Sequence, residues 1–190
     1  MSENLLNDLS PVPAIVPAYE ADEHLLVLLR ALSGEKRLSP IIVVNDGSGP
    51  ASMPVFADVH AIKGVVLLKH PRNLGKGAAL KTAFRYCLAH FPDCIGVVTA
   101  DCDGQHAPED ILATGKALET HPDCLVLGTR NFAASDIPAR SRLGNRISRM
   151  AFRLAGVRVS DTQTGLRGIP RGLLPSLLEI PYDRYEFETD

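Results

Sequence analysis

Short apolar runs alternate along the chain with longer segments in which apolar residues recur every three or four positions. The short runs predict strands at residues 14–17, 41–44, 65–68, 95–100 and 125–127. The longer segments predict helices over residues 20–33, 77–90 and 108–120. Strands that alternate with helices of this length are typical of βαβ units. We therefore predict an α/β fold in which a mostly parallel, Rossmann-like sheet is flanked by helices.

The polar motifs of the chain follow these predicted strands. Sheets of this kind bind their ligands at the carboxyl ends of the strands. No internal repeat, low-complexity segment or linker interrupts the pattern, so we expect a single domain over residues 1–190. Residues 185–190 look like the first turn of a helix, with acidic residues around an aromatic one. Because no helix follows them, we expect the chain to be truncated at its C-terminus.

Two carboxylates directly follow the predicted strand at 95–100. Asp101 and Asp103 would point the same way from an extended backbone, and Gln105 continues that face. In an arbitrary loop this pattern would be a solvated turn, but neighbouring carboxylates at the end of a buried strand repel unless a cation bridges them. Such oxygen ligands fit a Mg²⁺ or Mn²⁺ ion that holds a diphosphate. For the adjacent His106 we expect a hydrogen-bonding role or a loop role in preference to metal ligation.

Two further motifs leave alternatives open. Asp46 follows the predicted strand at 41–44 and would either shape a turn or bind the base or ribose of a nucleotide. Lys76 lies between Gly75 and Gly77, just before a predicted helix. Glycines there would either let backbone amides approach an anion or form a simple loop-to-helix junction.

The composition is that of an ordinary globular protein. The 190 residues are 45% hydrophobic and 22% charged, enough for one sizeable core. No apolar stretch approaches the roughly 18 residues of a membrane span, and the N-terminus lacks a signal-peptide pattern. The four cysteines form no Cys-x-x-Cys pair, which favours free thiols in a reducing compartment. With 5% aromatic residues and no tryptophan, nucleic acid is disfavoured as a partner.

Charge is distributed unevenly. Residues 137–171 hold eight arginines and a single acid, Asp161, for a net charge of +7, whereas the remainder carries −9. Within this region, four arginines share one helical face: Arg142, Arg146, Arg149 and Arg153. A parallel apolar stripe lies beside them: Leu143, Ile147, Met150 and Leu154. The pattern fits either a surface helix whose arginines pair with acids, or a helix that contacts lipid headgroups or an anionic lipid-linked substrate.

Six motifs together resemble a known enzyme family. In chain order they are Val16–Glu20, Val43–Ser48, Asn73–Gly77, Asp101–Gln105, Gly128–Arg130 and Asp161–Arg167. This series is similar to family 2 glycosyltransferases, and more narrowly to the dolichyl- and polyprenyl-phosphate sugar synthases, a group that includes dolichol-phosphate mannose synthase. The resemblance implies a GT-A fold, a nucleotide-sugar donor, a divalent metal ion (Mg²⁺ or Mn²⁺) and inversion at the anomeric carbon.

The resemblance also implies roles for individual residues. The nucleotide-sugar would be bound by Pro17, Ala18, Tyr19, Glu20, Asp46, Lys76, Gly77 and Asp101, with Asp46 at the base and Lys76 and Gly77 near the ribose and diphosphate. The metal site would comprise Asp101, Asp103 and Gln105, the last two as direct ligands. The acceptor phosphate would face Arg130, Arg142, Arg146, Ser148 and Arg167. Of these groups, Asp103, Arg130 and Arg167 would take part in catalysis.

Two departures from the family pattern concern the acceptor side. The family often has an arginine four residues before a serine, but here Gly144 stands at that distance from Ser148, so Arg142 or Arg146 would substitute. The family's region beyond the position of Asp190, which often leads to membrane helices, does not occur in this sequence.

The charge of the acceptor region favours a phosphate acceptor. A sugar hydroxyl needs a carboxylate base, whereas a lipid phosphate is already an anion and chiefly needs positioning. We therefore expect a polyprenyl phosphate acceptor and a cytoplasmic enzyme lying peripherally on an anionic membrane surface. The alternatives are a family 2 enzyme that extends a glycan with Asp161 or a later residue as base, a nucleotidyltransferase, and a non-enzymatic basic module. The last of these leaves the Asp101 motif unexplained.

Overall fold

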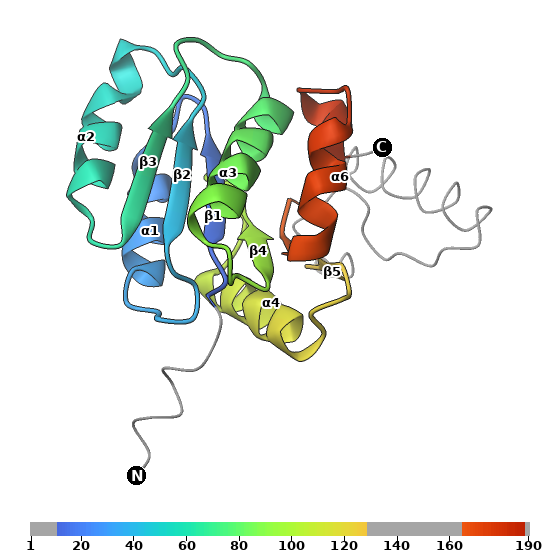
Figure 1. Ribbon diagram of the computed structural model, residues 1–190. Helices are drawn as coiled ribbons and strands as arrows, with labels where there is room; N and C mark the ends of the chain where they lie inside the picture. Colours follow the sequence, from blue (N-terminus) through green and yellow to red (C-terminus); the bar gives the residue numbers. More distant parts are fainter. Residues whose placement is uncertain (1–10, 129–164, 189–190) are drawn as a thin grey trace, which may run out of the picture.

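The computed structural model describes residues 11–128 and 165–188, which form a six-stranded sheet with helices on both faces (Figure 1). The strands are β1 (Ala14–Ala18), β2 (Ile41–Asn45), β3 (Val65–Lys69), β4 (Gly96–Thr99), β5 (Val126–Leu127) and β6 (Arg167–Pro170). Their order across the sheet is β3-β2-β1-β4-β6-β5. The first four strands in sequence are parallel, and β6 runs antiparallel to both β4 and β5. The α/β fold predicted from the sequence is confirmed.

The central strands are buried on both sides, which explains their uninterrupted apolar sequences. Alternate residues of β2 enter different cores: Ile41 and Val43 pack with one cluster, and Ile42 and Val44 pack with the other. Strands sandwiched in this way gain from apolar side chains at every position. The run from Ile41 to Val44 is therefore a sound predictor of a central strand.

Helices cover the two faces of the sheet in separate groups. The helices are α1 (Glu23–Leu32), α2 (Met53–Ala61), α3 (Lys76–His90), α4 (Pro108–Thr120) and α6 (Leu174–Glu179), with single 3-10 turns η2 (Pro50–Ser52), η3 (Arg171–Leu173) and η4 (Tyr185–Glu188). Apolar side chains of α1, α2 and α4 line the first core, and those of α3 and α6 line the second. In Figure 1, α3 crosses the near face of the sheet with α6 beside it.

Two local features differ from the predictions, and a third agrees with them. The helix α2 was not expected, because only Phe56 and Val59 of its nine residues are fully buried and its apolar periodicity is weak. The sequence predicts no strand after residue 127, yet Arg167 begins the strand β6. The antiparallel ladder with β4 holds that strand, pairing Thr99 with Arg167. The helical turn expected near Tyr185 is present as the 3-10 turn η4.

Some predictions lie outside the described residues. These are the arginine-striped helix and the residues Arg130, Arg142, Arg146, Ser148 and Asp161. Across the two described stretches, no helix is both long and apolar enough to cross a bilayer.

The turn after β2 depends on a glycine. Gly47 has a φ of +70°, and a Cβ there would overlap the backbone of Arg72. Gly64 also has a positive φ, of +84°, but open space surrounds it. Gly34 has neither feature. Alanine substitutions at these three positions therefore distinguish the energetic cost of steric overlap from that of backbone strain.

We predict that Gly47→Ala lowers the free energy of unfolding by more than about 3 kcal/mol, because it combines left-handed strain with overlap. Gly64→Ala should cost about 1 kcal/mol from strain alone, and Gly34→Ala should stay within about 0.5 kcal/mol of the wild type. Urea denaturation of the three variants measures these differences. Equal losses for Gly47→Ala and Gly64→Ala would contradict the overlap.

Candidate active site

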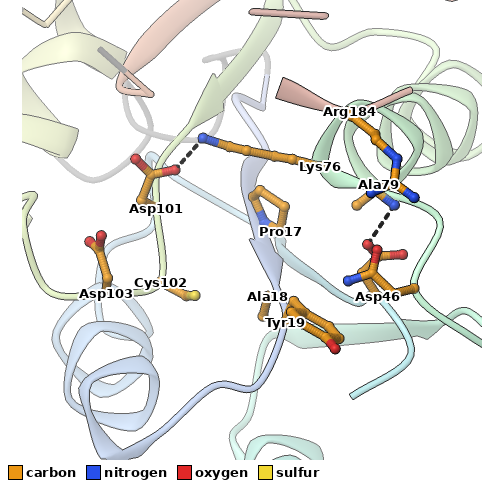
Figure 2. Close-up of a pocket in the computed structure, with 12 residues that line it drawn as sticks. Pro17, Ala18, Tyr19, Asp46, Lys76, Ala79, Asp101, Cys102, Asp103 and Arg184 are labelled. Atoms are coloured by element: carbon orange, nitrogen blue, oxygen red, sulfur yellow. Dashed lines mark hydrogen bonds and ion pairs between the residues drawn. The ribbon is translucent and has the colours of Figure 1, made fainter. Parts of the chain in front are cut away.

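A cavity of about 460 Å³ opens at the carboxyl ends of the parallel strands (Figure 2). Its lining comprises Pro17, Ala18, Tyr19, Asp46, Asn73, Gly75, Lys76, Ala79, Asp101, Cys102, Asp103 and Arg184. Six of the predicted nucleotide-sugar residues are among them: Pro17, Ala18, Tyr19, Asp46, Lys76 and Asp101. Asp103, predicted as a metal ligand, lies there too. The predicted residues Glu20 and Gly77 do not line the cavity.

Glu20 instead connects two loops. Its carboxylate Oε1 accepts a hydrogen bond of 2.7 Å from the amide of Gly49, and its own amide donates to Ser48 Oγ at 3.0 Å. Glu20 adopts a φ of +51°, which is uncommon for a residue with a side chain. These contacts hold the loop after β1 against the loop after β2, so Glu20 shapes the rim of the cavity from outside its lining.

Asp46 is almost completely buried and joins the end of β2 to the turn before α3. Its Oδ1 accepts a hydrogen bond of 2.9 Å from the amide of Leu74, and its Oδ2 accepts one of 2.8 Å from Gly75. His70 Nδ1 lies 2.7 Å from the same Oδ1, and His70 Nε2 lies 2.9 Å from Thr82 Oγ1. Asp46 thus shapes a turn, as one of the two interpretations of the sequence proposed, while its carboxylate also lines the cavity.

Asp101 carries its negative charge between two partners. Lys76 Nζ lies 2.6 Å from Oδ1, and His106 Nε2 lies 3.2 Å from Oδ2 (Figure 2 shows the lysine contact). Burial raises the pKa of the Asp101 carboxyl, but the hydrogen bond from His106 and the charge and hydrogen bond of Lys76 outweigh it, so the pKa lies well below its usual range. The hydrogen-bonding role expected of His106 is confirmed. Lys76 thus places a positive charge beside Asp101, whereas the sequence predicted a metal ion between Asp101 and Asp103.

Asp103 and Gln105 are exposed and contact each other. The Gln105 amide donates to Asp103 Oδ1 at 3.0 Å, and its side-chain Nε2 donates to Oδ2 at 2.6 Å. In Figure 2 the carboxylates of Asp101 and Asp103 lie on the same side of the segment. Within residues 11–128 and 165–188, no three His, Cys, Asp or Glu side chains gather as a metal site. A Mg²⁺ ion commonly takes one or two protein ligands and completes its shell with phosphate oxygens and water, a pattern that Asp103 and Gln105 fit.

Cys102 also lines the cavity, between the two aspartates. Burial raises the pKa of its thiol, and the charges of Asp103 and Asp101 raise it further. The thiol therefore stays protonated at neutral pH, and it offers neither a nucleophile nor a thiolate ligand.

Arg167 reaches the same edge of the sheet from the opposite chain direction. Because β6 is antiparallel to β4, its first residue pairs with Thr99, two residues before Asp101. Thr99 Oγ1 donates a hydrogen bond of 2.8 Å to the carbonyl of Gly165, which fastens this approach. Arg167 is the one predicted acceptor residue that the described stretches include, and it lies at the carboxyl end of β4.

Five residues of the lining were not predicted from the sequence: Asn73, Gly75, Ala79, Cys102 and Arg184. The first four lie within or beside recognised motifs, so adjacency was a usable signal. Arg184 carried only a weak signal, as the single basic residue after Arg171.

The low pKa of Asp101 predicts an effect of acid on stability. The pKa in the folded protein is below the ordinary 3.8, so the ionised group stabilises the fold above that value, and this stabilisation is lost as the pH falls below it. The difference in unfolding free energy between the wild type and Asp101→Asn should shrink between about pH 5 and about pH 2. Lys76→Met, which keeps the carboxylate but removes a partner, should lose stability at higher pH than the wild type. Urea denaturation over this range tests both, and a pH-independent difference would exclude the effect.

The chain is similar in sequence to several named sugar transferases. The chain is 28% identical over 190 residues to the UDP-N-acetylglucosamine–dolichyl-phosphate N-acetylglucosaminyltransferase of Methanococcus voltae, covering 90% of this chain and 74% of that protein. It is also 28% identical over 188 residues to the polyprenol monophosphomannose synthase of Mycolicibacterium smegmatis, with coverages of 93% and 68%. The undecaprenyl-phosphate 4-deoxy-4-formamido-L-arabinose transferase of Aeromonas hydrophila is 28% identical over 179 residues, and the chain spans 52% of its length.

The fold matches solved structures of the GT-A class. The glucosyl-3-phosphoglycerate synthase of Mycobacterium tuberculosis, solved with Mn²⁺, UDP and phosphoglyceric acid, superposes with a TM-score of 0.66 at 20% identity. The match covers 97% of this chain and 63% of that one. The predicted GT-A fold is therefore confirmed. The family model for glycosyl transferase family 2 matches residues 14–178, and this chain belongs to that family.

Proposed function

We propose that this domain transfers a sugar from a nucleotide-sugar donor to a polyprenyl phosphate, with a divalent metal ion and inversion at the anomeric carbon. The observation that carries the proposal is one cavity, at the carboxyl edge of the sheet, lined by Asp46, Lys76, Asp101 and Asp103. Curated relatives whose names specify dolichyl and undecaprenyl phosphate as acceptors support this acceptor class.

The metal ion, Mg²⁺ or Mn²⁺, would be held by Asp103 and Gln105. Both side chains are exposed beside the cavity, and both offer hard oxygen ligands. A divalent cation there would neutralise the charge that develops on the leaving diphosphate. Asp101, already ionised and paired with Lys76, would help to orient the donor beside this metal.

The acceptor phosphate would approach from the arginine-rich side. An ionised phosphate oxygen needs no general base, so the acceptor residues must position it and balance its charge. Arg167 lies at the edge of the sheet where the donor would react. We assign the same task to Arg130, Arg142, Arg146 and Ser148, and we propose that the basic region rests on an anionic membrane surface.

Asp103→Ala should abolish metal-dependent donor binding. Calorimetric titration of UDP-N-acetylglucosamine and GDP-mannose, each with Mn²⁺ and with EDTA, measures it. We expect the wild type to bind one donor only with Mn²⁺, and Asp103→Ala to lose at least about tenfold in affinity. Asp123→Ala removes an exposed carboxylate outside the cavity lining and serves as the control. Unchanged donor affinity in Asp103→Ala would contradict the assignment of Asp103 as a metal ligand.

Arg167→Ala should impair sugar transfer more than donor binding. Losing one charge-assisted hydrogen bond to the acceptor should lower kcat/KM for undecaprenyl phosphate by about 10- to 100-fold, with the donor Kd nearly unchanged. Transfer of labelled sugar in detergent gives the first value, and calorimetry gives the second. Arg30→Ala, an exposed arginine on α1, is the matched control. Equal losses in both measurements would argue against an acceptor role.

A further inference from the structure

The last described residues turn back across the second core after α6. We call residues 180–187 the C-terminal strap. The strap passes over the first turns of α3, and Phe187 packs into the second core against Phe84, with ring centroids 6.4 Å apart. This path brings a segment distant in sequence to the rim of the donor cavity.

One buried lysine fixes the strap. Lys81 on α3 is only 5% exposed, and its ammonium donates three hydrogen bonds to the strap. The acceptors are the carbonyls of Ile180 and Tyr182, at 2.6 and 2.8 Å, and Oδ1 of Asp183, at 2.6 Å. An ammonium has three donors, so all of its hydrogen-bonding capacity is spent on these contacts. Burying a charge is costly unless it is paired in this way, so the anchor selects one position of the strap.

The glycines before and in α3 make room for the strap. A Cβ at Gly75 would overlap the carbonyl of Asp183, and one at Gly77 would lie 2.6 Å from the Cβ of Phe187. The amide of Ala78 donates a hydrogen bond of 2.9 Å to that same carbonyl of Asp183. The glycines of this motif thus serve close packing, and the amides of Leu74, Gly75 and Ala78 donate to protein acceptors.

This anchoring places Arg184 in the lining of the donor cavity, on the side of Asp46 and Ala79 (Figure 2). The lining holds three carboxylates, Asp46, Asp101 and Asp103, and two cations, Lys76 and Arg184. Lys76 already pairs with Asp101. Within the two described stretches, the guanidinium of Arg184 makes no hydrogen bond or ion pair.

We propose that Arg184 binds the diphosphate of the nucleotide donor and that Lys81 is the positioning residue that holds it there. A diphosphate in a cavity lined by carboxylates is repelled unless cations offset them. A guanidinium presents a planar fork of donors that matches phosphate oxygens. The inference rests on the proposed function, because it takes the ligand of this cavity to be a nucleoside diphosphate.

The test compares Arg184→Gln with the wild type by calorimetric titration of UDP, UMP and uridine, and of GDP, GMP and guanosine, with Mn²⁺. Arg184 is exposed, so this variant should fold. We expect the affinity for the nucleoside diphosphate that binds to fall by about tenfold or more, and the affinity for its nucleoside to stay unchanged. Arg85→Gln, an exposed arginine on α3 outside the cavity lining, controls for the change in net charge.

The role of Lys81 is tested by comparing the losses of diphosphate affinity in the single variants and the double variant. Lys81→Met should lower the affinity for the diphosphate to the level of Arg184→Gln, and the double variant should lose nothing further, because both changes remove the same contact. Additive losses of affinity would show that Lys81 acts independently of Arg184 and would overturn its role as the positioning residue.

The outcomes separate the two proposals. If the wild type binds neither UDP nor GDP with Mn²⁺, the proposed function fails and the role of Arg184 fails with it. If the wild type binds and Arg184→Gln binds equally well, only the role of Arg184 is overturned. A loss that is as large for the nucleoside as for the diphosphate would place Arg184 at the base and would also overturn the proposal.

Discussion

The site depends on the turn that leads into α3, because three consecutive residues of that turn satisfy two carboxylates from different strands. The amides of Leu74 and Gly75 donate to Asp46 at the end of β2, and the ammonium of Lys76 pairs with Asp101 after β4. A buried carboxylate without such partners would either cost several kcal/mol or take up a proton. With them, the ends of β2 and β4 are held at fixed positions around the cavity, and the pKa of Asp101 stays below its usual range.

This arrangement would also prepare the site for the proposed anionic ligand. The pairing with Lys76 and His106 keeps Asp101 ionised, so no proton would have to leave if the proposed metal–diphosphate complex bound beside it. Within residues 11–128 and 165–188, the side chains of Asp103 and Gln105 form hydrogen bonds only between these two residues. Both side chains remain exposed. Of the three carboxylates that line the cavity, Asp46 is buried and Asp101 partly buried, whereas Asp103, which would bind the metal, is exposed.

The sequence predicted what local patterns control. Apolar runs such as Ile41–Val44 identified the central strands, and the spacing of Asp101 and Asp103 placed their carboxylates together at the carboxyl edge. What it could not predict depends on contacts between distant segments. The strand β6 contains a glycine and a proline and exists because it pairs with β4. Gly77 looks like part of a phosphate loop, but the fact that Phe187 packs against it is visible only in three dimensions.

The origin of the charges around the cavity suggests a division of tasks along the chain. The loops that follow the parallel strands β2 and β4 contribute the three carboxylates of the lining, which suits metal binding and contacts to the nucleoside. Two arginines reach this edge from segments that join later in the chain: Arg167 through the antiparallel strand β6, and Arg184 through the strap. Phosphate binding would thus be added to the parallel sheet by two segments that pack against it. The hydrogen bond from Thr99 to Gly165 fastens the segment that leads into β6, and the one from Lys81 to Asp183 fastens the strap. Thr99 belongs to β4, which leads to Asp101, and Lys81 belongs to α3, whose first residue Lys76 pairs with Asp101. The segments that carry Arg167 and Arg184 are therefore both fastened to elements that border the carboxylates of the cavity.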